Sequence, residues 1–82
     1  MIRYTAADVR RRVTFAQAGG VPVGIQSINR PGGKHPTIFA LRLGRDVVEV
    51  AGARAAYDVV DAWAKGYTAA LHDFLDRVRG MR

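Results

Sequence analysis

The segment Phe39–Val50, FALRLGRDVVEV, holds the clearest folding signal of the chain. Gly44-Arg45 at its centre suits a two-residue type II′ turn between antiparallel strands, because glycine adopts a positive φ without strain. A two-residue turn also fixes which residues face each other across the strands. The expected pairs are Leu43 with Asp46, Leu41 with Val48, and Phe39 with Val50. This register gathers the large apolar side chains on one face of the hairpin: Phe39, Leu41, Val48 and Val50.

Before this hairpin, the sequence predicts a helix over residues 6–18. Thr5 can cap its N-terminus, and Asp8, three residues on, occupies the reciprocal position of a capping box. The stripe expected to face the core is narrow and consists of Val9, Val13 and Ala16. Gly19-Gly20 then ends the helix.

A strand is expected near residues 21–28, where apolar and polar or small residues alternate. Pro22 and Gly24 place this strand at a sheet edge, since proline cannot donate to a central ladder. Residues 29–36 contain two prolines, two glycines and no large apolar side chain, so they predict a loop.

The last third predicts a helix from about 53 to 79. Its apolar residues recur at steps of three and four: Ala53, Ala56, Val60, Trp63, Tyr67, Leu71, Phe74 and Val78. Such a helix would span ~40 Å, whereas a compact domain of this size is ~30 Å across. The helix therefore either bends at Gly66 or overhangs and packs on another chain. Because the apolar phase runs unbroken through Gly66, we favour one helix, and we consider a homodimer through Leu71, Phe74, Leu75 and Val78.

These elements predict one α+β domain over residues 1–82, in the order α-β-β-β-α. A small antiparallel three-stranded sheet would pack on the long C-terminal helix. The start of the chain lacks the apolar run of a signal peptide, and no stretch approaches the length of a membrane span. A cytoplasmic protein without a membrane partner is the default expectation.

Charge is distributed unevenly along the chain, whose net charge is +6. Residues 1–45 carry eight basic side chains and one acidic side chain, a balance of +7, whereas residues 46–82 carry five and six. Most of the cations are arginine, which contacts phosphate or carboxylate in a bidentate manner. A GC-rich genome, which favours arginine and alanine, would give the same composition. If the asymmetry is functional, the expected contact residues are Arg10, Arg11, Arg12, Arg30 and Lys34.

Catalysis and metal binding find little support in the sequence. The chain has no cysteine, one serine (Ser27) and two histidines, His35 and His72. No ligand pair with metal-site spacing occurs, and a Ser/His/Asp trio drawn from these residues has no motif behind it. We therefore expect neither an enzyme nor a cofactor. The segment Pro31–Lys34 lacks the hydroxyl residue and following helix of a phosphate-binding loop, so it is either a mobile loop or a simple anion site.

The predicted element order is similar to that of the double-stranded-RNA-binding domain. Gly32, His35 and Phe39 also fall at the G-x-x-H-x-x-x-F spacing of that family. The chain departs from the family at the start of the last helix, where a lysine-rich phosphate-binding segment is replaced by residues 51–56, AGARAA. Gly32-Gly33 also replaces the expected glycine-proline. The sequence is therefore not assigned to this family.

Two functions follow as hypotheses. The first is a non-enzymatic binding protein whose basic N-terminal half engages an anionic partner, either nucleic acid or an acidic protein surface. The alternative is a small stand-alone protein–protein inhibitor or adaptor of the kind that phages and mobile elements encode, similar in size and type to anti-CRISPR proteins. Such a protein would act by covering a site on a larger complex.

Overall fold

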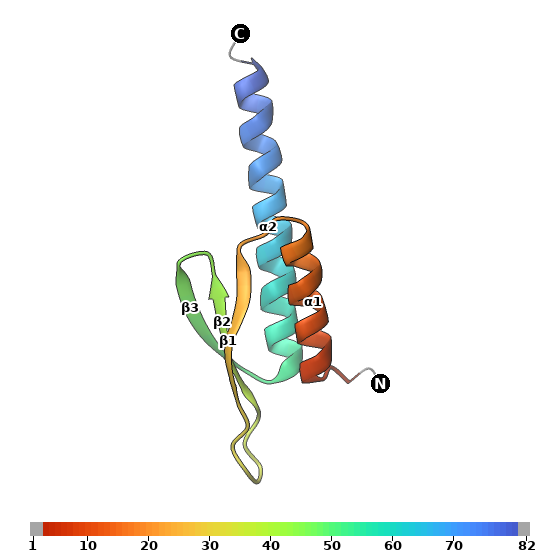
Figure 1. The fold of residues 1–82 in the computed structure, drawn as a ribbon, viewed down its shortest axis with the longest axis vertical. Coiled ribbons are helices and arrows are strands. Elements are labelled where there is room, and N and C mark those ends of the chain that lie inside the picture. Colours follow the sequence, from red (N-terminus) through yellow and green to blue (C-terminus); the bar gives the residue numbers. More distant parts are fainter. Residues whose placement is uncertain (1–2, 81–82) are drawn as a thin grey trace.

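The computed structural model describes residues 3–80, with side chains described through Arg77. The elements are α1 (Ala6–Ala18), β1 (Val23–Asn29), β2 (Ile38–Leu43), β3 (Asp46–Ala51) and α2 (Ala53–Gly80). The strands form one antiparallel sheet in the order β1-β2-β3. The predicted α+β class and the order α-β-β-β-α are thus confirmed (Figure 1).

The β2–β3 hairpin has the register that its turn predicts. Leu43 faces Asp46, and the pairing continues in step to Ile38 and Ala51. Gly44 has a φ of 67°, and no non-glycine residue in the described chain has a positive φ, as a type II′ turn requires. The Gly44 N–H also donates to the carbonyl of Pro22 at 2.9 Å, which ties this turn to the start of β1.

A β-bulge interrupts the strict alternation of β1. Ile25 pairs with Leu41, but Ser27 pairs with Ala40 and Ile28 with Phe39, so one extra residue sits in β1 between Ile25 and Ser27. An extra residue shifts the side-chain alternation by one position. As a result both Ile25 and Ile28 pack against the core.

Both helices cover the same face of the sheet and lie side by side (Figure 1). α1 contacts β1, and α2 contacts β2 and β3. The core between these layers consists mainly of valine and alanine around two larger side chains, Phe39 and Leu41. Two side chains join the helices to the start of β1 through hydrogen bonds to the backbone: Gln17 Nε2 donates to the Val23 carbonyl at 2.8 Å, and Trp63 Nε1 donates to the Pro22 carbonyl at 3.1 Å.

The predicted apolar face of the hairpin is only partly covered. Phe39 and Leu41 are fully buried, but Val48 is 39% exposed. Val48 belongs to β3, the edge strand farther from α1, where the helices do not reach over the whole sheet. The register was predicted correctly, whereas the burial of Val48 depends on how far the helical layer extends.

α2 continues through Gly66 without a break and projects beyond the rest of the molecule (Figure 1). Its last buried side chain is Ala64, Tyr67 is half-buried, and every side chain from Thr68 to Arg77 is exposed. The molecule is consequently 60 Å long but only 29 Å and 17 Å in its other dimensions. Of the two possibilities given by helix length, the overhang is the one observed, and Phe74 of the predicted apolar stripe is exposed on it.

Neither helix in the described part of the chain combines the length and the apolar character needed to cross a bilayer.

Candidate anionic-partner surface

The consecutive arginines of α1 point in three directions, because successive helical residues are 100° apart. Arg12 faces α2, where its Nε and Nη2 atoms lie 3.1 Å and 3.0 Å from Asp61 Oδ1. Its side chain is only 14% exposed. Lys65 Nζ lies 2.8 Å from the other oxygen of Asp61. Arg12 therefore joins α1 to α2 and is not free to meet a partner.

The acid of this group is held in its ionised form. Hydrogen bonding to Lys65 lowers the pKa of Asp61, and the hydrogen bond from Arg12 lowers it further, against an opposing effect of partial burial. One carboxylate thus serves two cations, and the cluster keeps a net positive charge.

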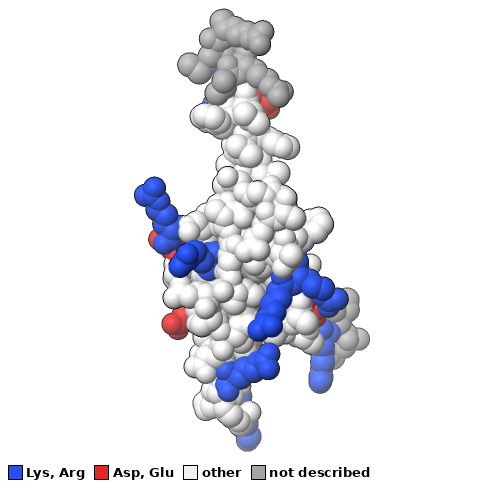
Figure 2. Space-filling view, in the orientation of Figure 1, with Lys and Arg blue, Asp and Glu red and all other residues white. Residues whose placement is uncertain are grey.

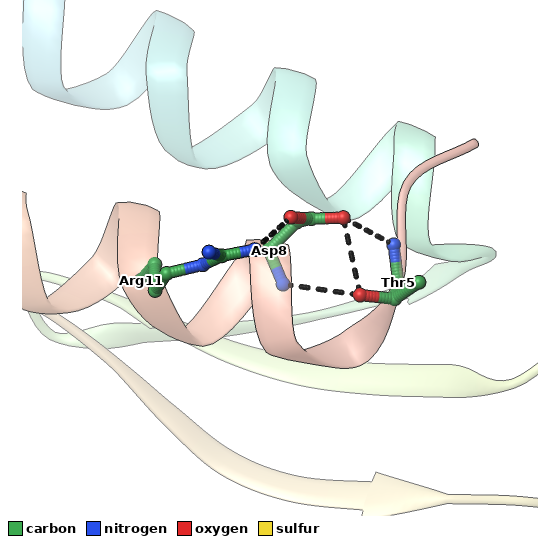
Figure 3. A network of polar contacts seen from close by, with 3 residues as sticks. All are labelled: Thr5, Asp8 and Arg11. Atoms are coloured by element: carbon green, nitrogen blue, oxygen red, sulfur yellow. Dashed lines mark hydrogen bonds and ion pairs between the residues drawn. The ribbon is translucent and has the colours of Figure 1, made fainter. Parts of the chain in front are cut away.

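Arg11 lies on the outer side of α1 and is paired within the helix. Asp8 accepts from Arg11 and also from the Thr5 backbone N–H, at 2.8 Å for the latter. The Thr5 hydroxyl in turn accepts from the Asp8 N–H, which completes the predicted capping box (Figure 3). The hydrogen bond from the Thr5 backbone is the main reason that the pKa of Asp8 is lowered. The Arg11 side chain remains 76% exposed, so this pair is accessible to a competing anion.

Arg10 lies on the β1 side of α1. It precedes Gln17 by seven residues, close to two helical turns, and so shares the helix face from which Gln17 reaches β1. The residue is exposed, and it takes part in none of the ion pairs formed among the described side chains.

Arg30 and Lys34 belong to the connection between β1 and β2. This loop extends beyond the sheet at the end of the molecule where both helices begin (Figure 1). Both residues are exposed, and neither is in an ion pair with another described residue. Three of the five predicted contact residues, Arg10, Arg30 and Lys34, therefore form no ion pair with any residue that the structure describes.

Three further cations of the N-terminal half were not singled out from the sequence. Arg3, Arg42 and Arg45 are exposed and likewise lie outside the ion pairs of the described chain. Figure 2 shows basic side chains over α1, the sheet and the β1–β2 loop, with acidic atoms mainly at the margins of this face. The half-chain charge balance already included these three arginines. They were not singled out because they are dispersed along the sequence, and they remain dispersed in the fold: Arg3 precedes α1, Arg42 lies in β2, and Arg45 lies in the β2–β3 turn, at the opposite end of the hairpin from the β1–β2 loop.

Aromatic side chains lie beside the cations of α1. A hollow of about 580 Å³ between α1 and α2 is lined by Arg3, Tyr4, Asp8, Arg11, Arg12, Phe15 and Tyr57. Tyr4 packs on Tyr57, with ring centroids 4.8 Å apart. Phe15 is 75% exposed, and the Arg12 guanidinium lies 5.7 Å from the centre of its ring. An exposed ring therefore stands next to a basic cluster.

A second, more apolar hollow lies at the end of α1. Half of its lining residues are small, and the others are larger or charged: Ala16, Gly19, Ala64, Thr68 and Ala69, and then Arg12, Phe15, Val21, Lys65 and His72. Above it, the projecting end of α2 exposes Leu71 by 43%, Phe74 by 62% and Leu75 by 41%. The side chain of Val78, the fourth residue of the predicted dimer contact, lies outside the described residues.

No group of three potential metal ligands occurs in the part of the chain that the structure describes. Comparison with protein-family models, with curated proteins and with solved structures found no match. The function must therefore be inferred from the chemistry of the surface itself.

Proposed function

We propose that this chain is a non-enzymatic binding protein that engages an anionic partner, in the first place nucleic acid, through its basic N-terminal half. Arg10, Arg30 and Lys34 would carry the contact, and Arg3, Arg42 and Arg45 would extend it. The observation behind the proposal is that all six are exposed and outside the ion pairs of the described chain. A cation without an acidic neighbour can neutralise a phosphate without first losing a protein partner.

The aromatic hollow favours nucleic acid over a purely acidic surface. Tyr4 and Phe15 present ring surface beside Arg3 and Arg11. Base-binding proteins combine such rings with cations, because the ring stacks on a base while the cation meets the phosphate. The exposed pair of Arg11 with Asp8 is weak enough to open for this purpose, since surface ion pairs contribute little.

The salt dependence of binding tests this proposal. Affinity for single- and double-stranded oligonucleotides, measured by fluorescence anisotropy, should fall steeply as salt rises. Each phosphate contact contributes about −0.9 to the slope of log K against log salt on duplex DNA, so R30A/K34A should reduce the slope by about 2. The control, R54A/R77A, removes the same number of exposed positive charges from α2, where Arg77 pairs with Asp73. We expect the control to leave the slope almost unchanged.

The proposal fails if the wild-type protein shows no affinity for either oligonucleotide at low salt. Equal losses in R30A/K34A and R54A/R77A would show that only net charge matters and that no defined surface exists.

A protein partner is the second candidate, and the exposed apolar side chains favour it. Phe15 and the second hollow beside it offer contact area that phosphate binding does not need. An inhibitor or adaptor should form a complex with its target that survives nuclease treatment. F15A should weaken that complex, whereas R30A/K34A should weaken it only if the target surface is acidic.

A further inference from the structure

The hollow of about 580 Å³ between α1 and α2 is lined by three aromatic residues and three arginines. Its volume lies within the ~300–1,000 Å³ range of pockets that take small organic ligands. Tyr4 and Tyr57, both half-buried, pack on each other in its lining. Phe15 follows Arg11 by four residues and Asp8 by seven, so these three side chains form one stripe along α1. Ring surface and positive charge therefore meet on one wall of the hollow.

The charge of this hollow is positive among the residues that the structure describes. Asp8 is the one acid in its described lining, and it already accepts hydrogen bonds from Thr5 and Arg11 (Figure 3). Arg12 faces α2 and is only 14% exposed. Arg11 is 76% exposed, and Arg3 is exposed and outside the ion pairs of the described chain. Arg3 and Arg11 are therefore the groups that can reach an anion bound at the hollow.

Phe15 supplies a surface on which a planar group can stack. The residue is 75% exposed, and the guanidinium of Arg12 lies 5.7 Å from the centre of its ring. Arg12 is itself held by Asp61, so the ring has a fixed neighbour on one side. An aromatic side chain beside cations accepts any nucleobase, because every base has a flat face and is joined to a phosphate. A nucleotide is therefore the ligand class whose planar and anionic parts match this wall.

The exposed cations lie on different faces of the molecule. Arg10 is on the β1 side of α1. Arg42 lies in β2 between Leu41 and Leu43, which both pack in the core, so its side chain points to the sheet face that the helices leave open (Figure 1). A nucleic-acid duplex is stiff, with a persistence length of about 50 nm, and can meet only one of these faces at a time. A single strand is flexible enough to follow cations from one face to another.

We propose that the hollow takes one unpaired base of a single-stranded nucleic acid, which stacks on Phe15 while Arg3 and Arg11 contact its phosphates. This preference rests on the proposed function and specifies its partner. A base inside a duplex reaches such a hollow only after it leaves the stack, at a cost in stacking and pairing energy. A strand whose bases are already unpaired does not bear that cost and therefore binds more tightly.

Three probes measured by fluorescence anisotropy test the proposal: a short thymidine oligonucleotide, the same strand in a duplex, and an abasic strand of the same length. The wild-type protein should bind the thymidine strand most tightly. F15A should weaken that binding about fivefold or more, as expected for one stacked base, and leave the other two affinities unchanged. Because Phe15 is 75% exposed, F15A should keep the wild-type circular dichroism spectrum. The matched control F74A removes another exposed phenylalanine, on the overhang and outside the hollow, and should bind as the wild type does.

The outcomes separate the base site from the proposed function. R3A should weaken binding of the thymidine and abasic strands by the same factor, because the phosphates are common to both. No binding to any probe overturns the proposed function and the base site together. Equal affinity for all three probes, or an F15A protein that binds the thymidine strand as tightly as the wild type or F74A does, overturns the base site alone. Thymidine monophosphate that binds as tightly as the oligonucleotide would show a site for a free nucleotide and overturn the assignment of a strand.

Discussion

At the scale of single residues, identical side chains in adjacent positions have different roles. Arg11 is 76% exposed and pairs with Asp8 within α1, whereas Arg12 is 14% exposed and pairs with Asp61 of α2. Their difference follows from the 100° rotation between neighbours on a helix, which turns one outward and the other toward a second helix. Charge type alone does not distinguish a contact residue from a structural one.

Replacing Asp61 should destabilise the fold and change its acid sensitivity. D61N leaves Arg12 partly buried without its carboxylate, and we expect the free energy of unfolding to fall by about 1–3 kcal/mol. Because the pKa of Asp61 is lowered from 3.8 in the folded state, its ionised form stabilises the fold above that pH, and this contribution is lost as the pH falls below it. Urea unfolding at neutral and acidic pH should therefore show a smaller acid-induced loss for D61N than for the wild type.

The control for this prediction is D58N, which removes an exposed acid from the same helix. Its stability and pH dependence should stay close to those of the wild type. A D61N profile that parallels the wild type across the acid range would show that the ion pair contributes nothing.

Two glycine-to-alanine changes should have opposite effects. At Gly44, with a φ of 67°, a Cβ would also lie 3.4 Å from the Trp63 ring. G44A should therefore lower the free energy of unfolding by at least about 1 kcal/mol. At Gly66 a Cβ meets nothing within 4 Å, and G66A should stabilise the helix by roughly 0.5–1 kcal/mol. Equal effects in thermal denaturation would refute the assignment of a special backbone conformation to Gly44.

At the scale of elements, the two sequence signals that predict a particular local geometry agree with the fold. The capping box of α1 and the Gly-X turn of the hairpin both formed as their residues predict. Each depends on contacts within three or four residues, which the sequence contains in full. The bulge in β1 is different, because only pairing with β2 reveals that a residue is left over between Ile25 and Ser27.

The N-terminal cap provides a direct test at this scale. T5A removes the hydroxyl that accepts from the Asp8 N–H and should lower the free energy of unfolding by about 1 kcal/mol. T14A, an exposed threonine inside the same helix, should be neutral or slightly stabilising, since alanine is the better helix former. Chemical denaturation measures both, and a T5A protein as stable as T14A would mean that the cap does not hold the helix.

At the scale of the whole molecule, the length of α2 sets the shape. A helix of 28 residues is longer than the sheet and α1 that cover it, so its end must leave the core. The same helix consequently has two kinds of apolar residue in one stripe, buried up to Ala64 and exposed from Leu71 onward. The overhang thus exposes Leu71, Phe74 and Leu75, whereas most of the described exposed cations, Arg77 excepted, lie on the rest of the molecule.

The sequence by itself determined the element order, the helix cap and the hairpin register, because each follows from periodicity or from neighbours along the chain. It also placed the excess positive charge in the first half. Only the tertiary structure decided that Arg12 forms an ion pair with Asp61 of α2, that Phe15 is exposed, and that the apolar stripe of α2 extends beyond α1 and the sheet. These depend on which side of α1 faces α2 and on where α1 ends against the longer helix. Such distances between elements are not encoded in any local pattern.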